Sequence, residues 1–476
     1  MNTQSPQACP EEPLDIIRTL QQAGYQAVLA GGCVRDMLLG HTPHDWDIAT
    51  SARPEQVEAL FPRTFPVGRQ FGIILVLAPS GTTYEVASFR GESTYSDGRH
   101  PDEVRFVEME EDVKRRDFTV NALLYDPIAR QLLDFVGGQE DLSRRLLRCV
   151  GDPRQRFQED RLRILRAIRF TANLGFTLEK STWEAVCQMA GTLLPAVSQE
   201  RIKEELEKML LHGASRQAFA LLAQSGHLRE ILPELEAEAG VEQPPQFHPE
   251  GDVWQHQLKI LGFLDDTLRK LRTTDQTPSP ETRFNQENQL QEATWEEQRW
   301  LAWGSLLHDV GKPSTYQEAD DRIRFNGHDV QGELITQEAL RRLRMDSTCL
   351  DNAAFLVRKH MEVTQLPQAR IARQRKAYQH PLFPLLLELL RVDTLSSWGN
   401  LELHHALVQG WKEEQRRPHP PKPYISGKDL IERGYQTGAA LGKFLRTCHD
   451  YELEHPFSSR EEALRWLDTT LASPKE

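Results

Sequence analysis

The sequence has few cysteines, no long apolar run and no excess of positive charge. Only six cysteines occur among 476 residues, none in a C-x-x-C arrangement, which argues against a disulfide framework and a zinc-thiolate site. No apolar run approaches the roughly 20 residues of a membrane span, and the N-terminus lacks the basic segment and apolar core of a secretory signal. We therefore expect a cytoplasmic protein with no membrane partner.

The formal net charge of −13 excludes a protein that coats nucleic acid without specificity, because such binding needs many lysines and arginines facing phosphates. Positive charge is nevertheless concentrated in one place. The stretch from Arg144 to Arg169 contains nine arginines and no lysine. An acidic chain of this kind can still hold one basic groove for an RNA end.

The chain is too long for one ordinary core, and its pattern changes near residue 150. Before that point we predict a helix over 13–24, a buried strand over 26–30, a helix over 33–40, and two hairpin strands over 72–79 and 82–90 that meet around Gly81. After about residue 155, apolar residues at three- and four-residue spacing predict helices, with no strand expected beyond Val150. The polar segment 273–298 predicts a disordered or loosely ordered insertion.

The short stretch 29–50, LAGGCVRDMLLGHTPHDWDIAT, combines features that suit phosphate chemistry. Gly31 and Gly32 end a predicted strand and open a helix, where free backbone N–H groups can hold a triphosphate. Arg35, one turn into that helix, can add positive charge.

Carboxylates in and after this stretch predict a divalent metal site. Asp45 and Asp47 are two residues apart, so on an extended strand both carboxylates project from one face and can share one or two divalent ions. Glu85 lies on a predicted neighbouring strand and is the candidate for a third carboxylate. In a phosphoryl transfer, this carboxylate would deprotonate the hydroxyl that attacks the phosphorus. A single D-x-D or Gly-Gly is commonly a turn or a cap, so the prediction depends on their strand–turn–helix–strand order.

Four motifs in order resemble the class II tRNA nucleotidyltransferases and bacterial poly(A) polymerases. They are GGCVRD at 31–36, DWDIAT at 45–50, RRDFTVNALLYD at 115–126 and EDRLRILRAIRF at 159–170. The resemblance implies that Asp45 and Asp47 bind catalytic Mg²⁺ and that Arg116 with Asp117 contacts the ribose and phosphates of the nucleotide. The implied nucleotide-binding set is Gly31, Gly32, Arg35, Arg116, Asp117, Asn121, Glu159, Asp160, Arg163, Arg166 and Arg169.

The resemblance also implies an α+β fold with a polymerase-beta-like head, which carries the small mixed sheet, followed by an all-helical neck, body, HD domain and tail. The corresponding boundaries are 1–147 for the head, 148–250 for the neck and body, 251–400 for the HD domain with the insertion 273–298, and 401–476 for the tail.

The motif E-D-x-x-R at 159–163 suggests how a base is selected. On a continuous helix Glu159, Asp160 and Arg163 share one face. Asp160 can accept from an exocyclic amine and Arg163 can donate to a ring acceptor, a pattern that cytosine and adenine present. Without the upstream motifs, an ordinary surface ion pair on an arginine-rich helix is the favoured explanation of the same residues.

Two stretches of the head bear on which nucleotides are added. Residues 90–106 occupy the place of the family's flexible loop, whose loss marks enzymes that stop after CC, and GRQFGIIL at 68–75 resembles the CCA-adding pattern. We therefore expect addition of CCA, or of its terminal A, to tRNA 3′ ends from CTP and ATP. An A-adding-only enzyme or a poly(A) polymerase stays open as an alternative.

A second constellation lies in the predicted helical half. Its candidate metal ligands are His256, His308, Asp309 and Asp393, with His328 and His360 as candidates for a second metal or for phosphate. A set of imidazole and carboxylate ligands fits Mn, Mg, Fe or Ni better than a closed structural zinc site. The transition metal expected at this site is Ni, Mn or Co. The series resembles the HD phosphohydrolase domain that some tRNA nucleotidyltransferases carry.

The HD resemblance leaves one alternative of another class, an HD phosphohydrolase with an idle RNA-binding head. Intact Asp45, Asp47 and Asp117 argue against it. The expected partners are the tRNA 3′ end, CTP and ATP, and the expected state is a monomer or weak dimer.

Overall fold

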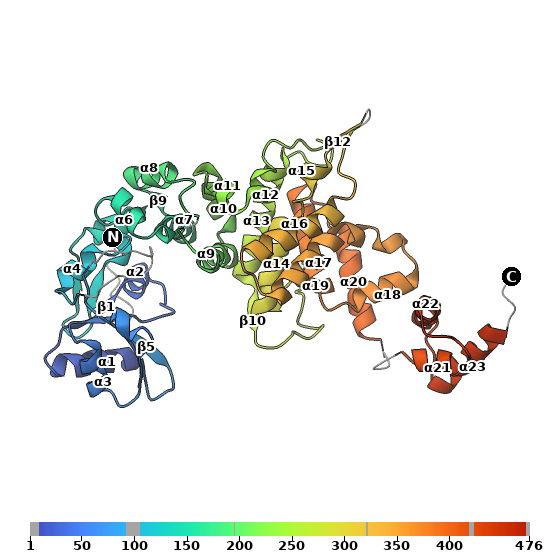
Figure 1. The fold of residues 1–476 in the computed structure, drawn as a ribbon, viewed down its shortest axis with the longest axis horizontal. Helices are drawn as coiled ribbons and strands as arrows, with labels where there is room; N and C mark the ends of the chain where they lie inside the picture. Colours follow the sequence, from blue (N-terminus) through green and yellow to red (C-terminus); the bar gives the residue numbers. More distant parts are fainter. Residues whose placement is uncertain (1–8, 92–104, 195, 320–321, 418–422, 473–476) are drawn as a thin grey trace. The chain divides into compact units, whose positions relative to one another are not determined.

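The computed structural model describes residues 9–91, 105–194, 196–319, 322–417 and 423–472. The chain divides into two compact units, each described separately below (Figure 1). The first comprises Met1–Met209 with Gln217–Pro233, and the second comprises Leu210–Arg216 with Glu234–Glu476. The division lies inside the segment 148–250 rather than at either end of it.

The first unit contains the predicted mixed sheet, which has seven strands in the order β3-β4-β5-β2-β1-β6-β7. The strands are β1 (Ala27–Ala30), β2 (Ile48–Thr50), β3 (Thr64–Phe65), β4 (Ile73–Leu77), β5 (Thr83–Ser88), β6 (Leu124–Asp126) and β7 (Gln131–Leu133). Strand β1 is buried along its whole length, and β4 and β5 form the predicted hairpin around Gly81. Strands β2 and β5 pair in parallel, with Ile48 opposite Val86.

Short helices cover the sheet, and longer helices follow it in the chain. The α-helices that surround the sheet are α1 (Glu11–Gln22), α2 (Gly32–Leu38), α3 (Pro54–Leu60), α4 (Met109–Lys114) and α5 (Gly138–Ser143). Those that follow are α6 (Pro153–Glu159), α7 (Leu162–Leu174), α8 (Lys180–Gln188), α9 (Gln199–Leu211), α10 (Ser215–Gln224) and α11 (His227–Ile231). The predicted helix over 13–24 is α1, displaced by two residues because Glu11 and Glu12 favour its first turn.

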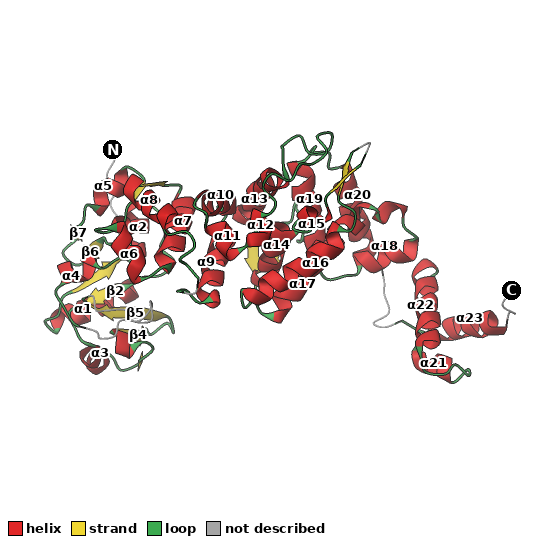
Figure 2. Ribbon diagram, turned by 45° about the horizontal axis from the view of Figure 1, so that its top comes forward, coloured by secondary structure: helices red, strands yellow, loops and turns green. Residues whose placement is uncertain are grey.

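The second unit is largely helical, as Figure 2 shows. Its α-helices are α12 (Pro233–Glu236), α13 (Val253–Lys270), α14 (Trp295–Leu307), α15 (Lys312–Thr315), α16 (His328–Arg342), α17 (Ser347–Thr364), α18 (Ile371–Tyr378), α19 (Phe383–Ser396), α20 (Glu402–Gln415), α21 (Gly427–Ile431), α22 (Ala439–Glu454) and α23 (Arg460–Ala472). The last three surround a hydrophobic cluster of their own that includes Ile425, Leu430 and Leu467.

The expectation of no strand beyond Val150 is wrong. The structure has β9 (Thr177–Leu178), which pairs with β8 (Leu146–Leu147), and two further pairs: β10 (Arg272–Thr274) with β11 (Glu292–Thr294), and β12 (Gln317–Glu318) with β13 (Ile323–Arg324). Strands of two or three residues are too short to show an alternating apolar pattern, so periodicity does not reveal them.

The prediction of a loosely ordered insertion over 273–298 is also wrong. The segment includes most of β10, all of β11 and the first turn of α14. Its polar composition conceals two buried apolar anchors, Phe284 and Leu290, and a buried ion pair in which Arg283 donates to both carboxylate oxygens of Glu297 at 2.9 and 2.6 Å. Paired charges satisfy each other inside the fold, so a polar sequence can pack.

We expect Glu297→Ala to lower the free energy of unfolding of the second unit by about 3–5 kcal/mol, because it leaves the Arg283 charge buried without a partner. The side chain of Arg283 is only 2% exposed, and Glu297 also completes the capping box of α14 with Thr294. Urea unfolding followed by tryptophan fluorescence measures the loss. Glu296→Ala, an exposed neighbour in the same helical turn, is the control, and equal stability of the two variants contradicts the account.

Two expected absences concern the part of the chain that the structure describes. No helix there is long and apolar enough to cross a membrane. All six cysteines are free thiols, in agreement with the prediction from their spacing.

Candidate active sites

The first site is built around the glycine turn between β1 and α2. Gly31 has φ +78°, a conformation that residues with a side chain rarely adopt. A Cβ atom at Gly31 would lie 3.2 Å from Nη1 of Arg116 and 3.6 Å from the backbone oxygen of Asn121. The turn therefore brings the start of α2 directly against two residues of the predicted nucleotide-binding set.

The candidate catalytic carboxylates meet where β2 and β5 lie side by side. Because Ile48 pairs with Val86 in parallel register, Asp47 and Glu85 immediately precede paired residues on neighbouring strands. Partial desolvation and the charge of Asp45 raise the pKa of Asp47, and desolvation together with Asp47 raises the pKa of Glu85. The three acids therefore form one electrostatic cluster.

This cluster has the chemistry of a divalent cation site. Hard carboxylate oxygens are the ligands that Mg²⁺ prefers, and a bound cation removes the mutual repulsion that raises the two pKa values. The three carboxylates do not, however, all place an oxygen within 4.8 Å of the others. Among the described residues, every group of three with ligand atoms within 4.8 Å of one another lies in the second unit.

A chain of hydrogen bonds connects the glycine helix to α7. Arg35 donates to Oδ1 of Asn121 at 2.6 Å, the Asn121 amide lies 3.4 Å from Oδ1 of Asp117, and Arg166 donates to Oδ2 of Asp117 at 2.9 and 2.7 Å. Burial opposes ionisation of Asp117, but the Arg166 guanidinium outweighs it and lowers the pKa of Asp117. Asp117 is therefore an anion that orients other side chains. Arg116 lies beside this chain and pairs with Asp112 at 3.2 Å.

The motif E-D-x-x-R does not lie on one continuous helix, contrary to the prediction. Helix α6 ends at Glu159, Asp160 is extended with φ −143° and ψ 108°, and α7 begins at Leu162. The physical reason is local, because the Asp160 carboxylate accepts from the backbone N–H of Leu162 at 3.0 Å and so starts the next helix. Glu159 and Arg163 still form an ion pair, at 2.7 Å.

Two residues of α9 complete the set and were missed by sequence reasoning. Arg201 pairs with Asp160 at 2.8 Å, and Glu205 pairs with Arg169 at 2.6 Å. Their spacing of four places both on one face of α9, which is the signal that could have drawn attention to them. Asp160 is thus held by Arg201 rather than by Arg163.

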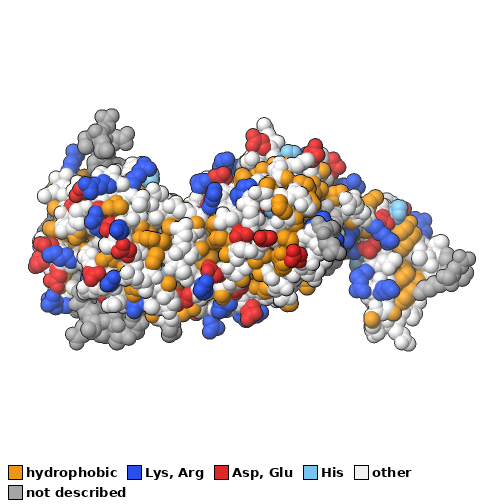
Figure 3. All heavy atoms as spheres, turned by 90° about the horizontal axis from the view of Figure 1, so that it is seen from above, with side chains coloured by type: hydrophobic (Ala, Val, Ile, Leu, Met, Phe, Trp, Pro, Cys, Tyr) orange, Lys and Arg blue, Asp and Glu red, His pale blue; other side chains and the backbone are white. Residues whose placement is uncertain are grey.

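The arginine-rich stretch is largely neutralised within the unit, which sequence alone did not reveal. Six of its nine arginines form ion pairs with carboxylates: Arg144, Arg148, Arg156, Arg163, Arg166 and Arg169. On the face of the molecule seen in Figure 3, basic and acidic side chains are interspersed rather than gathered in one stripe. Most of the loop 90–106 lies outside the described residues, and Arg90 and Phe106 at its ends form a bridge.

The second site brings its predicted ligands together from three places in the second unit: His256 on α13, the adjacent His308 and Asp309 in the turn after α14, and Asp393 on α19. Nε2 of His256 lies 3.1 Å from Oδ1 of Asp393, and with His308 these residues form one group with ligand atoms within 4.8 Å. Asp309, His328 and His360 form a second such group. The Oδ1 atom of Asp309 lies 3.5 Å from Nε2 of His328 and 3.8 Å from Nε2 of His360.

The imidazoles are oriented by hydrogen bonds on their far side. The Nδ1 atoms of His308, His328 and His360 lie 3.1, 2.8 and 2.6 Å from the backbone oxygens of Ser305, Phe325 and Val357 respectively. Only a protonated nitrogen can donate to a carbonyl, so each neutral ring carries its proton on Nδ1 and keeps its Nε2 lone pair for the site. Metal-binding histidines are usually oriented in this way, by a hydrogen bond from the ring nitrogen that does not bind the metal.

The charge of the second site also fits a bound cation. Burial and the neighbouring imidazoles lower the pKa of His360 to about 4, which keeps it neutral as a metal ligand must be. Burial opposes protonation of His256, but its hydrogen bonds with Asp393 and Glu250 prevail and raise its pKa to about 9. A proton on His256 places positive charge between the carboxylates of Glu250 and Asp393. A divalent cation would also supply positive charge to this site.

Three residues that the sequence reasoning did not select support this site. Glu250 accepts from Nδ1 of His256 at 2.6 Å and from Nδ1 of His248 at 3.0 Å. Lys312 donates to Oδ2 of Asp309 at 2.6 Å and to Oε1 of Gln243 at 2.7 Å. The sequence offered a signal for these residues. His248 and Glu250 belong to the stretch HPEGDVWQH that contains His256, and Lys312 lies three residues after Asp309.

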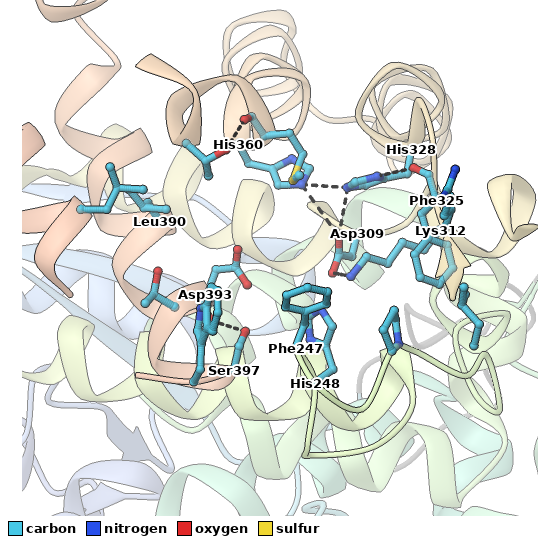
Figure 4. A pocket seen from close by; sticks show the side chains of 18 of the residues that line it. Phe247, His248, Asp309, Lys312, Phe325, His328, His360, Leu390, Asp393 and Ser397 are labelled. Carbon is cyan, nitrogen blue, oxygen red and sulfur yellow. Dashed lines mark hydrogen bonds and ion pairs between the residues drawn. The ribbon is translucent and has the colours of Figure 1, made fainter. Parts of the chain in front are cut away.

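A cavity of about 780 Å³ opens onto these ligands. Figure 4 shows His328, His360 and Lys312 reaching toward Asp309 from one side of the cavity, with Phe247 and His248 on the other side and Asp393 and Ser397 along its edge. We call this space the HD cavity; it is large enough for a small organic ligand.

Comparison with known proteins assigns both sites to recognised domains. Residues 27–148 match the Poly A polymerase head domain, residues 175–238 match the family described as the probable RNA and SrmB-binding site of polymerase A, and residues 288–393 match the HD domain. The chain is 37% identical over 341 residues to the CCA-adding enzyme of Lactobacillus helveticus, an alignment that covers 69% of this chain and 80% of that protein. The chain belongs to the CCA-adding enzyme family.

Other members of the CCA-adding enzyme family agree. The Bacillus subtilis CCA-adding enzyme is 49% identical over 221 residues, which cover 46% of this chain and 55% of that protein. The crystal structure of the Bacillus stearothermophilus CCA-adding enzyme in complex with CTP matches with a TM-score of 0.64 and 28% identity over 97% of both chains. The predicted nucleotidyltransferase class and polymerase-beta-like head are thereby confirmed.

In this member of the CCA-adding enzyme family the HD match starts at residue 288 and does not include His256. The fold supplies His256 from α13, where it is fully buried beside Asp393 of α19. The HD and head domains both imply divalent metals, and the paired ligand groups of the second unit fit that requirement.

Proposed function

We propose that the chain adds CCA, or its terminal A, to the 3′ ends of tRNA, using CTP and ATP. The observation that supports this best is the position of Asp47 beside the glycine turn, in a chain that belongs to the CCA-adding enzyme family: the N–H of Ala30, directly before Gly31, donates to the backbone oxygen of Asp47 at 3.0 Å. The acid cluster supplies carboxylates that can bind a cation, and the glycine turn supplies backbone N–H groups that can bind phosphates.

The reaction forms a bond between the tRNA 3′ oxygen and the α-phosphorus and breaks the bond from that phosphorus to the bridging oxygen, so pyrophosphate leaves. Asp45 and Asp47 would hold Mg²⁺, which supplies charge stabilisation of the attacking and leaving oxygens. Glu85, whose pKa is raised, takes the proton of the 3′ hydroxyl. The backbone of Gly31 and Gly32 with Arg116 positions the triphosphate.

Selection of the base is assigned to Asp160 and Arg163. Glu159 holds the Arg163 guanidinium, Arg201 holds the Asp160 carboxylate, and the helix break between them separates the two groups. Two fixed groups, one acceptor and one donor, can read the Watson–Crick edge of cytosine or adenine without a nucleic-acid template. Arg201 is a positioning residue in this scheme.

We expect Arg163→Ala to lower incorporation of C and A and to let UTP or GTP compete, with discrimination reduced about 5- to 150-fold, because each paired base contact contributes about 1–3 kcal/mol. Competition assays at subsaturating nucleotide concentrations measure the ratio. Arg154→Ala, an exposed arginine of α6, is the matched control. An unchanged nucleotide preference in Arg163→Ala contradicts the assignment.

Incubation of the protein with tRNA that lacks CCA, and with each labelled nucleotide separately, tests the proposal. Incorporation from CTP alone supports CCA addition. Incorporation only from ATP onto tRNA that ends in CC indicates an A-adding enzyme, and long A tracts on any RNA indicate a poly(A) polymerase. An idle head incorporates nothing.

A second activity, metal-dependent phosphohydrolysis at the HD cavity, is favoured by the two ligand groups around Asp309. His256, His308, Asp309 and Asp393 would hold a transition metal such as Ni²⁺, Mn²⁺ or Co²⁺, which supplies activation of water for attack on phosphorus. One P–O bond forms, the ester P–O bond breaks, and the proton of the water goes to the leaving oxygen. A 2′,3′-cyclic phosphate at a damaged RNA end is the first substrate to try, because its removal restores a 3′ hydroxyl.

We also propose that the protein acts in the cytoplasm as a monomer or weak dimer. Six free cysteines and a tRNA substrate support this location. Light scattering at several protein concentrations tests the oligomeric state.

A further inference from the structure

A buried carboxylate of the head, Asp112 of α4, holds two consecutive arginines of the RRDFTVNALLYD motif. The side chain of Asp112 is only 3% exposed. Its Oδ1 atom accepts from Nε and Nη2 of Arg115 at 3.0 and 2.5 Å, and its Oδ2 atom accepts from Nη2 of Arg116 at 3.2 Å. Burial opposes ionisation of Asp112, but the two guanidinium groups outweigh it and lower the pKa of Asp112. Asp112 is therefore a buried anion with two cationic partners.

The second of these partners, Arg116, lies against the glycine turn. Its Nη1 atom donates to the backbone oxygen of Asn121 at 3.4 Å and lies 3.2 Å from the place that a Cβ atom would take at Gly31. The positive charge of Arg116 also lowers the pKa of Asp47, against the larger effects of burial and Asp45. Asp112 thus holds, from behind, a guanidinium that faces the expected place of the triphosphate.

The first partner, Arg115, connects the same carboxylate to the residue assigned to base selection. The backbone oxygen of Arg115 accepts from Nη2 of Arg163 at 3.2 Å, while Nη1 of Arg163 donates to Glu159 at 2.7 Å. That oxygen belongs to the peptide bond that joins Arg115 to Arg116. The guanidinium of Arg163 is therefore positioned by the same short segment that Asp112 fixes.

Two parts of the nucleotide site consequently share one support. Arg116 is assigned to the triphosphate and Arg163 to the base, and hydrogen bonds with a charged donor connect both of them to the segment that Asp112 holds. Such bonds are roughly twice as strong as neutral ones. A displacement of the segment would move the phosphate contact and the base contact together.

We propose that Asp112 is a positioning residue that keeps Arg116 and Arg163 in register, so that a nucleotide is accepted only when its base and its phosphates fit at the same time. The inference rests on the proposed nucleotidyl transfer and deepens it, because it adds a determinant of nucleotide specificity that lies behind the site. Asp112 acts through the two arginines and has no contact of its own with the nucleotide.

The test uses Asp112→Asn, which removes the charge and keeps the shape of the side chain. On tRNA that ends in CC, kcat/KM for ATP should fall about 10- to 150-fold, the effect of losing a hydrogen bond to a charged group. The preference for ATP over GTP should fall at least about fivefold, since the base contact of Arg163 is displaced. Glu110→Gln makes the same chemical change on the exposed side of α4, where the acid pairs with Lys114, and should match wild type.

A purely structural role of Asp112 predicts a different result. It would lower the thermal stability and the amount of active protein, and so reduce the rates with ATP and GTP by the same factor. An unchanged preference for ATP over GTP in Asp112→Asn therefore overturns the proposal. Asp112→Glu keeps the charge but displaces the carboxylate by one methylene, so the same loss of preference is expected, and it replaces the Asn variant if that variant does not fold.

Double variants show whether the effect passes through the two arginines. In an Arg163→Ala background, Asp112→Asn should reduce the preference for ATP over GTP no further. In an Arg116→Ala background, it should weaken the binding of ATP no further, because residues that act through one another are not additive. Fully additive losses in both backgrounds contradict the positioning role.

A binding measurement separates the positioning role from the activity on which it rests. Equilibrium dialysis of labelled ATP and GTP with Mg²⁺ against full-length wild type and Asp112→Asn needs neither tRNA nor incorporation, and the second unit contributes equally to both proteins. Weaker and less selective binding by Asp112→Asn supports the role even if wild type extends no tRNA, in which case only the proposed function fails. Equal binding by the two proteins overturns the role.

Discussion

Asp45→Ala and Asp47→Ala are each expected to reduce nucleotide incorporation by at least about 10³-fold. Loss of one ligand from a metal that stabilises the attacking and leaving oxygens removes several kcal/mol of transition-state stabilisation, and every 1.36 kcal/mol is about tenfold in rate. Binding of tRNA should survive, because the two carboxylates face the metal rather than the RNA.

Single-turnover incorporation of labelled nucleotide measures the rate of these variants, and gel-shift titration measures their tRNA binding. Asp15→Ala, which removes an exposed acid that pairs with Arg18 of the same helix α1, is the control and should match wild type. Retention of a tenth of the wild-type rate in both active-site variants would remove the basis for assigning the site.

The second large effect is expected at the HD cavity, where His308→Ala and Asp309→Asn should each remove bound metal and phosphohydrolase activity, about 10²-fold or more. His308 belongs to one ligand group and the adjacent Asp309 belongs to the other, so the loss of either residue leaves one group incomplete. Nucleotide addition should change less than twofold, because the head carboxylates belong to the other unit.

Elemental analysis of the purified protein and hydrolysis of a 2′,3′-cyclic phosphate with Ni²⁺, Mn²⁺ or Co²⁺ test this expectation. Asn is chosen at 309 so that Lys312 keeps a hydrogen-bond partner, and His405→Ala, an exposed histidine of α20, is the control. Wild-type protein without metal and without activity toward any phosphoester would reduce the HD domain to a scaffold.

Sequence alone predicted what depends on local patterns. The strand, glycine turn and helix around Gly31 are visible because one backbone conformation demands glycine there. Glu85 could be placed on a strand near the Asp-x-Asp stretch because buried and exposed residues alternate along β5, whereas the parallel register of β2 and β5 was not predictable. His256 could be grouped with Asp393 only through the order of the HD motifs, since 137 residues separate them.

What the sequence could not predict depends on competition between contacts. Whether Asp160 continues a helix or starts the next one depends on its bond to the Leu162 N–H and on Arg201, which comes from a distant helix. The segment 273–298 looked loosely ordered because its charges were counted as exposed, whereas Arg283 and Glu297 pair inside the fold. In both cases a contact that the local sequence pattern does not reveal reverses the expectation.

The most direct measurement is the mass of a tRNA that lacks CCA after incubation with the wild-type protein, Mg²⁺ and all four nucleoside triphosphates. The account predicts that tRNA ending in CC gains one A and no more, and that tRNA lacking CCA gains CCA and no more if the enzyme adds all three residues. A tRNA ending in CC that is not extended, or a product that carries U, G or a tract of A, would contradict it.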